Sequence, residues 1–221
     1  MTRTWMLFDT GTCQEVTCRF YDPLPDRTLS GFVINSPCRD FDDAAENAVH
    51  AVYAGLKARG FSFSSRQAAI SLSSAEAHPD PADSAGQSGG LAFAIAAARQ
   101  FLSDQDPETA STLPAMAATG VIDDTGAVSR VRGIPAKLEA AAEAVKENGF
   151  IFYPKGNRPQ LPPGLEETLE AENIRLCPVA RLDQVFDILL GPPPNTTVNK
   201  KLLVMLLAAV LILAAAAGFF Y

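Results

Sequence analysis

Apolar and polar positions recur with two different periods along residues 1–190. Alternation of apolar and polar positions predicts strands, and apolar positions spaced three and four apart predict helices. The predicted strands cover residues 5–8, 15–21, 31–35, 67–73, 115–122, 127–131, 150–153 and 174–178. The predicted helices cover residues 42–59, with Asp42 or Asp43 as the cap, 88–102, 135–148, 165–171 and 181–190. This order of short strands and helices favours one α+β or α/β domain.

The C-terminal segment has a different pattern. Residues 202–221 form an apolar run without a charged side chain. At about 1.5 Å per residue, a helix of this length is about 30 Å long, which matches the hydrocarbon core of a bilayer. Residues 191–201 form a Pro-rich linker that ends in Lys200 and Lys201, the side on which positive charge is expected to stay in the cytoplasm. We therefore expect a C-terminal transmembrane helix.

Localisation follows from the two ends of the sequence. No apolar segment follows Arg3, so no signal peptide is predicted. We expect a single-pass, tail-anchored protein with its domain in the cytoplasm, held in a bacterial inner membrane.

Charge and cysteine content narrow the possible partners. The net charge of −7 argues against nucleic acid as a partner. Cys13, Cys18, Cys38 and Cys177 contain no C-x-x-C pair. In a cytoplasmic domain we expect them to be small buried thiols rather than disulfides or zinc ligands. No cofactor is predicted.

Ser88 lies in a glycine-rich segment, residues 84–90 (SAGQSGG), which opens a predicted apolar helix. The N–H groups at a helix N-terminus have no helical partner and lie in positive potential, which suits a developing oxyanion. Gly86, Gly89 and Gly90 would let a substrate backbone approach closely. The alternative is that Ser88 merely caps the helix.

Lys137 closes the segment 131–137 (VRGIPAK) and lies on the flank of the apolar face of its helix. Partial burial would lower its pKa and leave some neutral amine near neutral pH. A neutral amine can take the proton of a serine hydroxyl, so Ser88 and Lys137 are candidates for a catalytic dyad. The alternative is a lysine whose stem covers apolar surface while its charge reaches water.

A serine–histidine–aspartate triad is a competing interpretation. His78, with Asp80 or Asp83 to orient it, lies in the loop before Ser88, whereas the sequence does not indicate a triad role for His50 on its predicted helix.

Taken together, these segments resemble the proteolytic domain of Lon proteases over about residues 10–190. The serine loop of that family, Asp-Gly-Pro-Ser-Ala-Gly, corresponds to residues 85–90 (AGQSGG). Its Met-Thr-Gly-Glu strand and turn corresponds to residues 118–121 (ATGV), and its Gly-Gly-x-x-x-Lys segment to residues 132–137 (RGIPAK). Its last two strands correspond to residues 150–154 and 174–179.

The resemblance implies a fold, an activity and an assembly. The fold is the Lon proteolytic-domain fold, which is ribosomal S5 domain 2-like. Ser88 would be the nucleophile and Lys137 the general base, with Thr119 helping to orient the amine. The substrate would be a peptide or an unfolded protein, and the assembly a homo-oligomeric ring, expected to be a hexamer.

The chain departs from the family pattern near the site. Ala85 and Val121 stand where the family has acidic residues, Gln87 and Gly89 replace the proline and alanine beside the serine, and Arg132 replaces a glycine. No G-x-x-x-x-G-K-[ST] motif occurs, so the chain has no ATPase of its own and a separate ATPase would have to unfold its substrates. We expect a serine endopeptidase. The alternative is a noncatalytic Lon-like scaffold anchored to the membrane.

Overall fold

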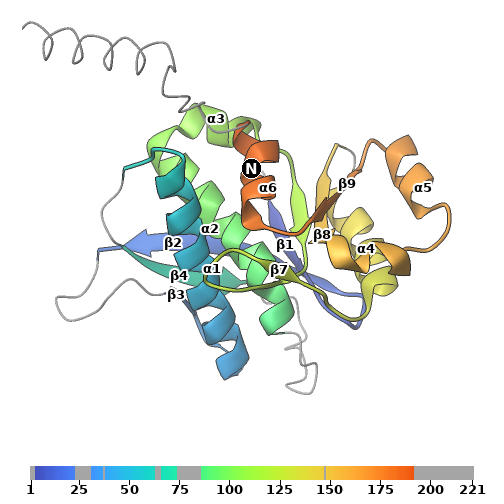
Figure 1. The fold of residues 1–221 in the computed structure, drawn as a ribbon, viewed down its shortest axis with the longest axis horizontal. Coiled ribbons are helices and arrows are strands. Elements are labelled where there is room, and N and C mark those ends of the chain that lie inside the picture. The colour runs from blue at the N-terminus through green and yellow to red at the C-terminus, as the bar shows by residue number, and fades with distance from the viewer. Residues whose placement is uncertain are drawn as a thin grey trace, which may run out of the picture.

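A computed structural model of the protein describes residues 3–22, 31–36, 38–62, 66–73, 86–146 and 148–191. These residues form a seven-stranded sheet with helices on both faces and a separate two-stranded hairpin (Figure 1). The strands are β1 Thr4–Leu7, β2 Cys13–Tyr21, β3 Gly31–Val33, β4 Gln67–Leu72, β5 Met116–Ala118, β6 Val121–Ile122, β7 Val128–Ser129, β8 Phe150–Pro154 and β9 Arg175–Val179. The helices are α1 Arg39–Ala58, α2 Gly90–Gln105, α3 Pro107–Thr112, α4 Ile134–Val145, α5 Leu165–Ala171 and α6 Leu182–Leu190, with 3-10 helices η1 Gln87–Gly89 and η2 Lys155–Gln160.

The sheet is mixed and mostly parallel. Its order is β3-β4-β2-β1-β5-β8-β9, and β2 runs antiparallel to both of its neighbours while every other pair is parallel. Parallel neighbours need crossover connections, which α4 supplies between β5 and β8, and α5 between β8 and β9. This mixed α/β arrangement is consistent with the predicted α+β class.

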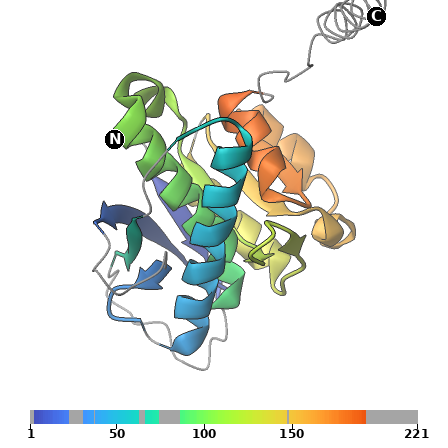
Figure 2. The same ribbon diagram turned by 60° about the vertical axis from the view of Figure 1, so that its left-hand side comes forward.

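Two apolar layers cover the sheet. Helices α1, α2 and α6 pack on one face, and α4 and α5 pack on the other (Figures 1 and 2). Helix α2 packs on the central strands of the sheet and on α1, and every residue from Gly90 to Ala98 is buried. The apolar residues of this predicted helix are therefore buried against the sheet and the neighbouring helix.

One predicted strand is wrong in its extent. Residues 115–122 form two strands, β5 and β6, which belong to different sheets. The chain leaves the large sheet at Thr119, whose N–H donates to Phe152 O at 3.1 Å, and the next N–H, of Gly120, donates to Ser88 O at 2.8 Å. The break therefore joins the end of β5 to the serine segment.

Two helix ends also differ from prediction. Helix α1 begins at Arg39 rather than Asp42, and Asp42 does not cap it, because its carboxylate accepts the N–H of Val33 at 3.0 Å. Helix α4 ends at Val145, before Lys146 and Asn148 adopt positive φ angles of 54° and 62°. The pattern also missed α3, which Asp106 caps, and η2.

Several predictions fall outside the described residues. These are the transmembrane helix 202–221, nearly all of the linker 191–201, and His78, Asp80 and Asp83 of the loop before Ser88. Within the described ranges, no helix combines the length and the apolar character needed to cross a bilayer.

Candidate active site

Ser88 lies in the 3-10 turn η1, directly before α2. It is not the N-cap of that helix, because Gly89 holds the N-cap position. The side chain is largely buried, with 8% of the residue exposed. The Ser88 carbonyl accepts the N–H of Gly120, which fixes the turn against the end of β5.

The glycines around Ser88 serve packing rather than substrate approach. A Cβ at Gly86 would lie 2.8 Å from the Phe41 ring, and one at Gly89 would lie 2.6 Å from Met6 Sδ. A Cβ at Gly90 would lie 2.8 Å from the side chain of Ile122. The expectation that these glycines leave room for a substrate is therefore wrong in this conformation.

The backbone amides after Ser88 also differ from expectation. The N–H groups of Gly89, Gly90 and Leu91 donate to the carbonyl oxygens of Gly86, Gln87 and Gly120 respectively. They are therefore not the unpaired donors that the sequence suggested for an oxyanion site.

Lys137 lies in the first turns of α4, and its N–H donates to Gly133 O at 3.0 Å. Pro135 near the start of the helix has a φ angle suited to that position. The whole residue is buried, with 0% exposed. Lys137 therefore does not extend its charge to solvent, and the alternative of a surface-covering lysine is excluded.

Three side-chain oxygens surround the Lys137 amine. Nζ lies 3.1 Å from Ser88 Oγ and 3.3 Å from Thr119 Oγ1, and it forms an ion pair with Asp9 Oδ1 at 2.6 Å. Ser88 and Lys137, 49 residues apart in the chain, are thus within hydrogen-bond distance.

Burial lowers the pKa of Lys137 below its ordinary value, because the charged form loses its hydration. Asp9 opposes this effect through a hydrogen bond and its negative charge, and the positive charge of Arg132 adds to it. The amine therefore loses its proton more easily than an exposed lysine does, although the Asp9 carboxylate favours the ammonium form.

Thr119 lies beside the amine, as the resemblance implied. It is fully buried, and its hydroxyl is 3.3 Å from Lys137 Nζ and 3.3 Å from Ser88 O. One hydroxyl can accept from the first and donate to the second, so Thr119 links Lys137 to Ser88.

Asp9 is the residue that the sequence analysis missed. It follows β1 in the turn to β2 and reaches Lys137 because α4 packs against β1, with Gly133 directly beside Asp9. The local signal, an Asp before Thr10 and Gly11, indicates only a turn. No sequence pattern shows that β1 packs against α4.

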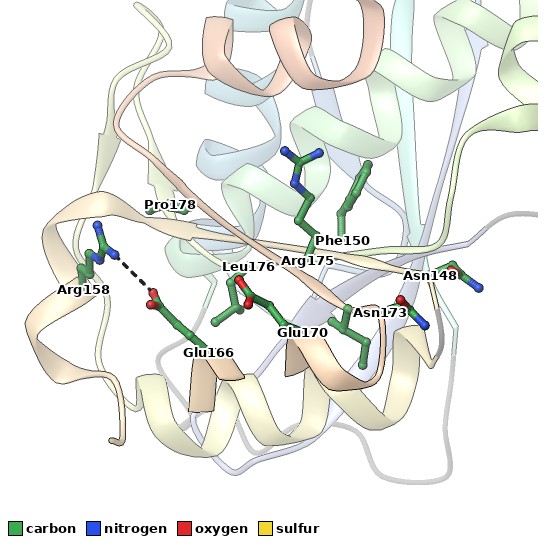
Figure 3. A pocket seen from close by; sticks show the side chains of 10 residues that line it. Asn148, Phe150, Arg158, Glu166, Glu170, Asn173, Arg175, Leu176 and Pro178 are labelled. Carbon is green, nitrogen blue, oxygen red and sulfur yellow. Dashed lines mark ion pairs between the residues drawn. The ribbon is translucent and has the colours of Figure 1, made fainter. Parts of the chain in front are cut away.

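The described surface hollows lie away from Ser88 and Lys137. The one in Figure 3, of about 560 Å³, lies against the edge strand β9 and helix α5. It carries an ion pair between Arg158 and Glu166 at 3.6 Å, and its lining includes neither Ser88 nor Lys137. Pro178 also lines it and removes one N–H from the edge strand, which opposes pairing with another strand. This hollow does not serve the dyad.

The other candidate residues are only partly placed. His50 lies on α1, and the proposed triad partners of Ser88 lie outside the described residues, so the triad interpretation stays open. Cys18 and Cys177 are buried as expected, and burial raises their pKa values to about 12 and about 11. Cys38 is exposed, contrary to expectation. Across the described ranges, no group of His, Cys, Asp and Glu side chains is arranged to hold a metal ion.

Comparison with known proteins gives no family assignment. No protein-family model matches the chain, and no curated protein matches it. The resemblance to Lon therefore depends on the residues quoted above and on the contacts of Ser88, Lys137 and Thr119.

Proposed function

We propose that the chain is a membrane-anchored, Lon-like serine endopeptidase that cleaves peptides or unfolded proteins through Ser88 and Lys137. The observation that carries this proposal is the fully buried Lys137 amine, 3.1 Å from Ser88 Oγ. A lysine is costly to bury, and one that lies beside a serine hydroxyl and has a lowered pKa is suited to general-base chemistry.

The reaction would follow from these contacts. Neutral Lys137 takes the proton of Ser88 while Oγ forms a bond to the carbonyl carbon of the scissile peptide. The resulting ammonium group then gives that proton to the leaving amine nitrogen as the carbon–nitrogen bond breaks. Water attacks the acyl-enzyme, with Lys137 again accepting a proton, and Ser88 is regenerated when it recovers one.

The oxyanion of this reaction needs N–H donors. Because the amides of Gly89, Gly90 and Leu91 donate to carbonyl groups, the proposal requires either other N–H donors or a rearrangement of η1 when substrate binds. The same observation favours the second candidate, a noncatalytic scaffold with the same fold. The costly burial of the Lys137 amine against Ser88 favours the enzyme.

Anchoring and assembly belong to the same proposal. Residues 202–221 would hold the domain at the cytoplasmic face of a membrane. Assembly into a hexameric ring and a separate ATPase that delivers substrates are implied only by the resemblance to Lon.

The proposal is tested with the full chain in detergent, incubated with unfolded casein without ATP. We expect the wild type to cleave casein, and Ser88→Ala and Lys137→Met to abolish cleavage. Methionine retains most of the buried lysine stem, so circular dichroism should show a folded variant. Exposed Lys155→Ala and Ser111→Ala are matched controls that should cleave like the wild type. Equal cleavage by the Ser88→Ala variant, or none by the wild type in the presence of a folded domain, would contradict the proposal.

A further inference from the structure

The Asp9 carboxylate contacts the amine of the dyad more closely than the serine does. Asp9 Oδ1 is 2.6 Å from Lys137 Nζ, against 3.1 Å for Ser88 Oγ. The Asp9 side chain is 34% exposed, whereas the lysine side chain is 0% exposed. Asp9 thus places a negative charge that solvent can reach next to the buried amine.

The turn around Asp9 is held in place on both sides. The N–H of Phe8 donates to Thr12 O at 2.9 Å, and the N–H of Gly11 donates to Phe8 O at 3.1 Å. Gly133 lies directly behind, with a φ angle of 68°, and a Cβ there would lie 3.3 Å from Asp9 Cα. Glycine at position 133 therefore supplies both the left-handed backbone and the room that Asp9 occupies.

The number of donors and acceptors identifies the protonation state that fits this arrangement. An ammonium group has three N–H donors, and the three oxygens of Asp9, Ser88 and Thr119 surround Nζ. A neutral amine has two N–H donors and one lone pair, and only that lone pair can accept the serine proton. The observed contacts therefore fit the ammonium form, which is not a base.

We propose that Asp9 is a positioning residue that holds Lys137 in its ammonium form in the free protein, so that Lys137 becomes the base for Ser88 only when this ion pair is broken. The inference rests on the proposed function. Once the carboxylate moves away or is neutralised, the ammonium group gives one proton to solvent water and presents its lone pair to Ser88 Oγ.

The charges around the Lys137 amine determine in which direction Asp9 shifts its protonation. Asp9 comes from the turn after β1, and Arg132 from the segment before α4. Ser88 from η1 and Thr119 from the end of β5 contribute neutral hydroxyls. Among these facing groups of the described structure, Asp9 carries the negative charge, so its removal favours the neutral amine.

The test is Asp9→Asn in the full chain, because asparagine keeps the shape and an acceptor oxygen but not the charge. Two measurements are made against pH: the NMR titration of the Lys137 Cε group, and the rate at which a fluorophosphonate labels Ser88. We expect both midpoints to fall by about one pH unit or more, and labelling below the midpoint to become about tenfold faster. An unchanged or raised NMR midpoint would overturn the inference.

The control is Glu15→Gln, which removes a negative charge from the same hairpin, where Glu15 pairs with Arg3 at 3.6 Å. It should leave both midpoints unchanged. If Asp9→Asn does not fold, Asp9→Ser supplies the same comparison. Absence of Ser88 labelling in every protein at every pH would contradict the peptidase, whereas the NMR midpoint tests the role of Asp9 without requiring activity.

Discussion

At the scale of single residues, the site consists of buried polar side chains that satisfy one another. Thr119 shows this most clearly, because its hydroxyl lies between Lys137 Nζ and Ser88 O at 3.3 Å from each. A buried polar group without a partner costs about 1–3 kcal/mol, so each member of such a group constrains the others. Thr119 therefore sets the direction in which the Lys137 amine faces Ser88.

Replacing the Thr119 hydroxyl should slow the reaction of Ser88 without unfolding the domain. Thr119→Val keeps the shape but removes the hydrogen bonds, and a loss of about 1.4 kcal/mol of orientation corresponds to about tenfold slower labelling of Ser88. Thr119→Ser keeps the hydroxyl and should retain most of the rate, although loss of a buried methyl group lowers stability by about 1 kcal/mol. Labelling rates and urea unfolding separate the two effects. Equal rates in both variants would contradict the assigned role.

The sequence was sufficient to predict part of this site. Ser88 and Lys137 stand out because each lies a few residues after a glycine in a segment that opens an apolar helix, and the resemblance added Thr119. Asp9 could not be found in this way, because its contact with Lys137 depends on the packing of β1 against α4, which are more than a hundred residues apart. Local patterns identify site residues whose position is set by the helix or strand that contains them. They miss residues whose position depends on packing against a distant segment.

At the scale of elements, periodicity predicted most strands and helices but not where the chain changes sheets. The segment from Ala115 to Ile122 is apolar except at Thr119 and Gly120, and a Thr-Gly pair inside an apolar run fits a continuous strand as well as a break, so the pattern alone does not locate the break. The position of α4 likewise depends on a contact outside the helix. Asn157 of η2, fully buried, accepts the N–H of Val131 at 3.0 Å and donates to Val131 O at 2.8 Å, just before the turn into α4.

Asn157→Ala should destabilise the domain strongly for the replacement of a single small side chain. The change leaves the N–H and the carbonyl of Val131 without these partners in a buried place, at about 1–3 kcal/mol each. We expect the free energy of unfolding to fall by about 3 kcal/mol, measured by urea unfolding of the full chain. Gln160→Ala is the matched control, because it removes only the third bond of Asn157, at 2.8 Å. A loss in the control as large as that in Asn157→Ala would show that the Val131 contacts are not the cause.

At the scale of the whole described structure, the last of its helices closes it against the first. Helix α6 packs on α1 (Figure 2). The ring of Phe186 meets the backbone at Gly55, and the Arg59 guanidinium lies 5.5 Å from the ring centroid. Arg59 also pairs with Asp187 at 2.5 Å. The strand order and the contact between α6 and α1 bring together segments that are far apart in the sequence. No local pattern relates such segments, so the sequence predicted the fold class but neither the order of the strands nor the packing of α6 on α1.

Gly55→Ala tests this closing contact against the ordinary preference of helices. In an unobstructed helix, alanine is more favourable than glycine by about 1 kcal/mol. At position 55 the new methyl group would overlap the Phe186 ring, and overpacking costs about 1–3 kcal/mol, so we expect a net loss of stability. Phe186→Leu removes the obstructing ring atoms, and the double variant should lose less stability than the sum of the single changes. Urea unfolding of the four proteins measures the coupling, and strict additivity would mean that α6 does not bear on Gly55.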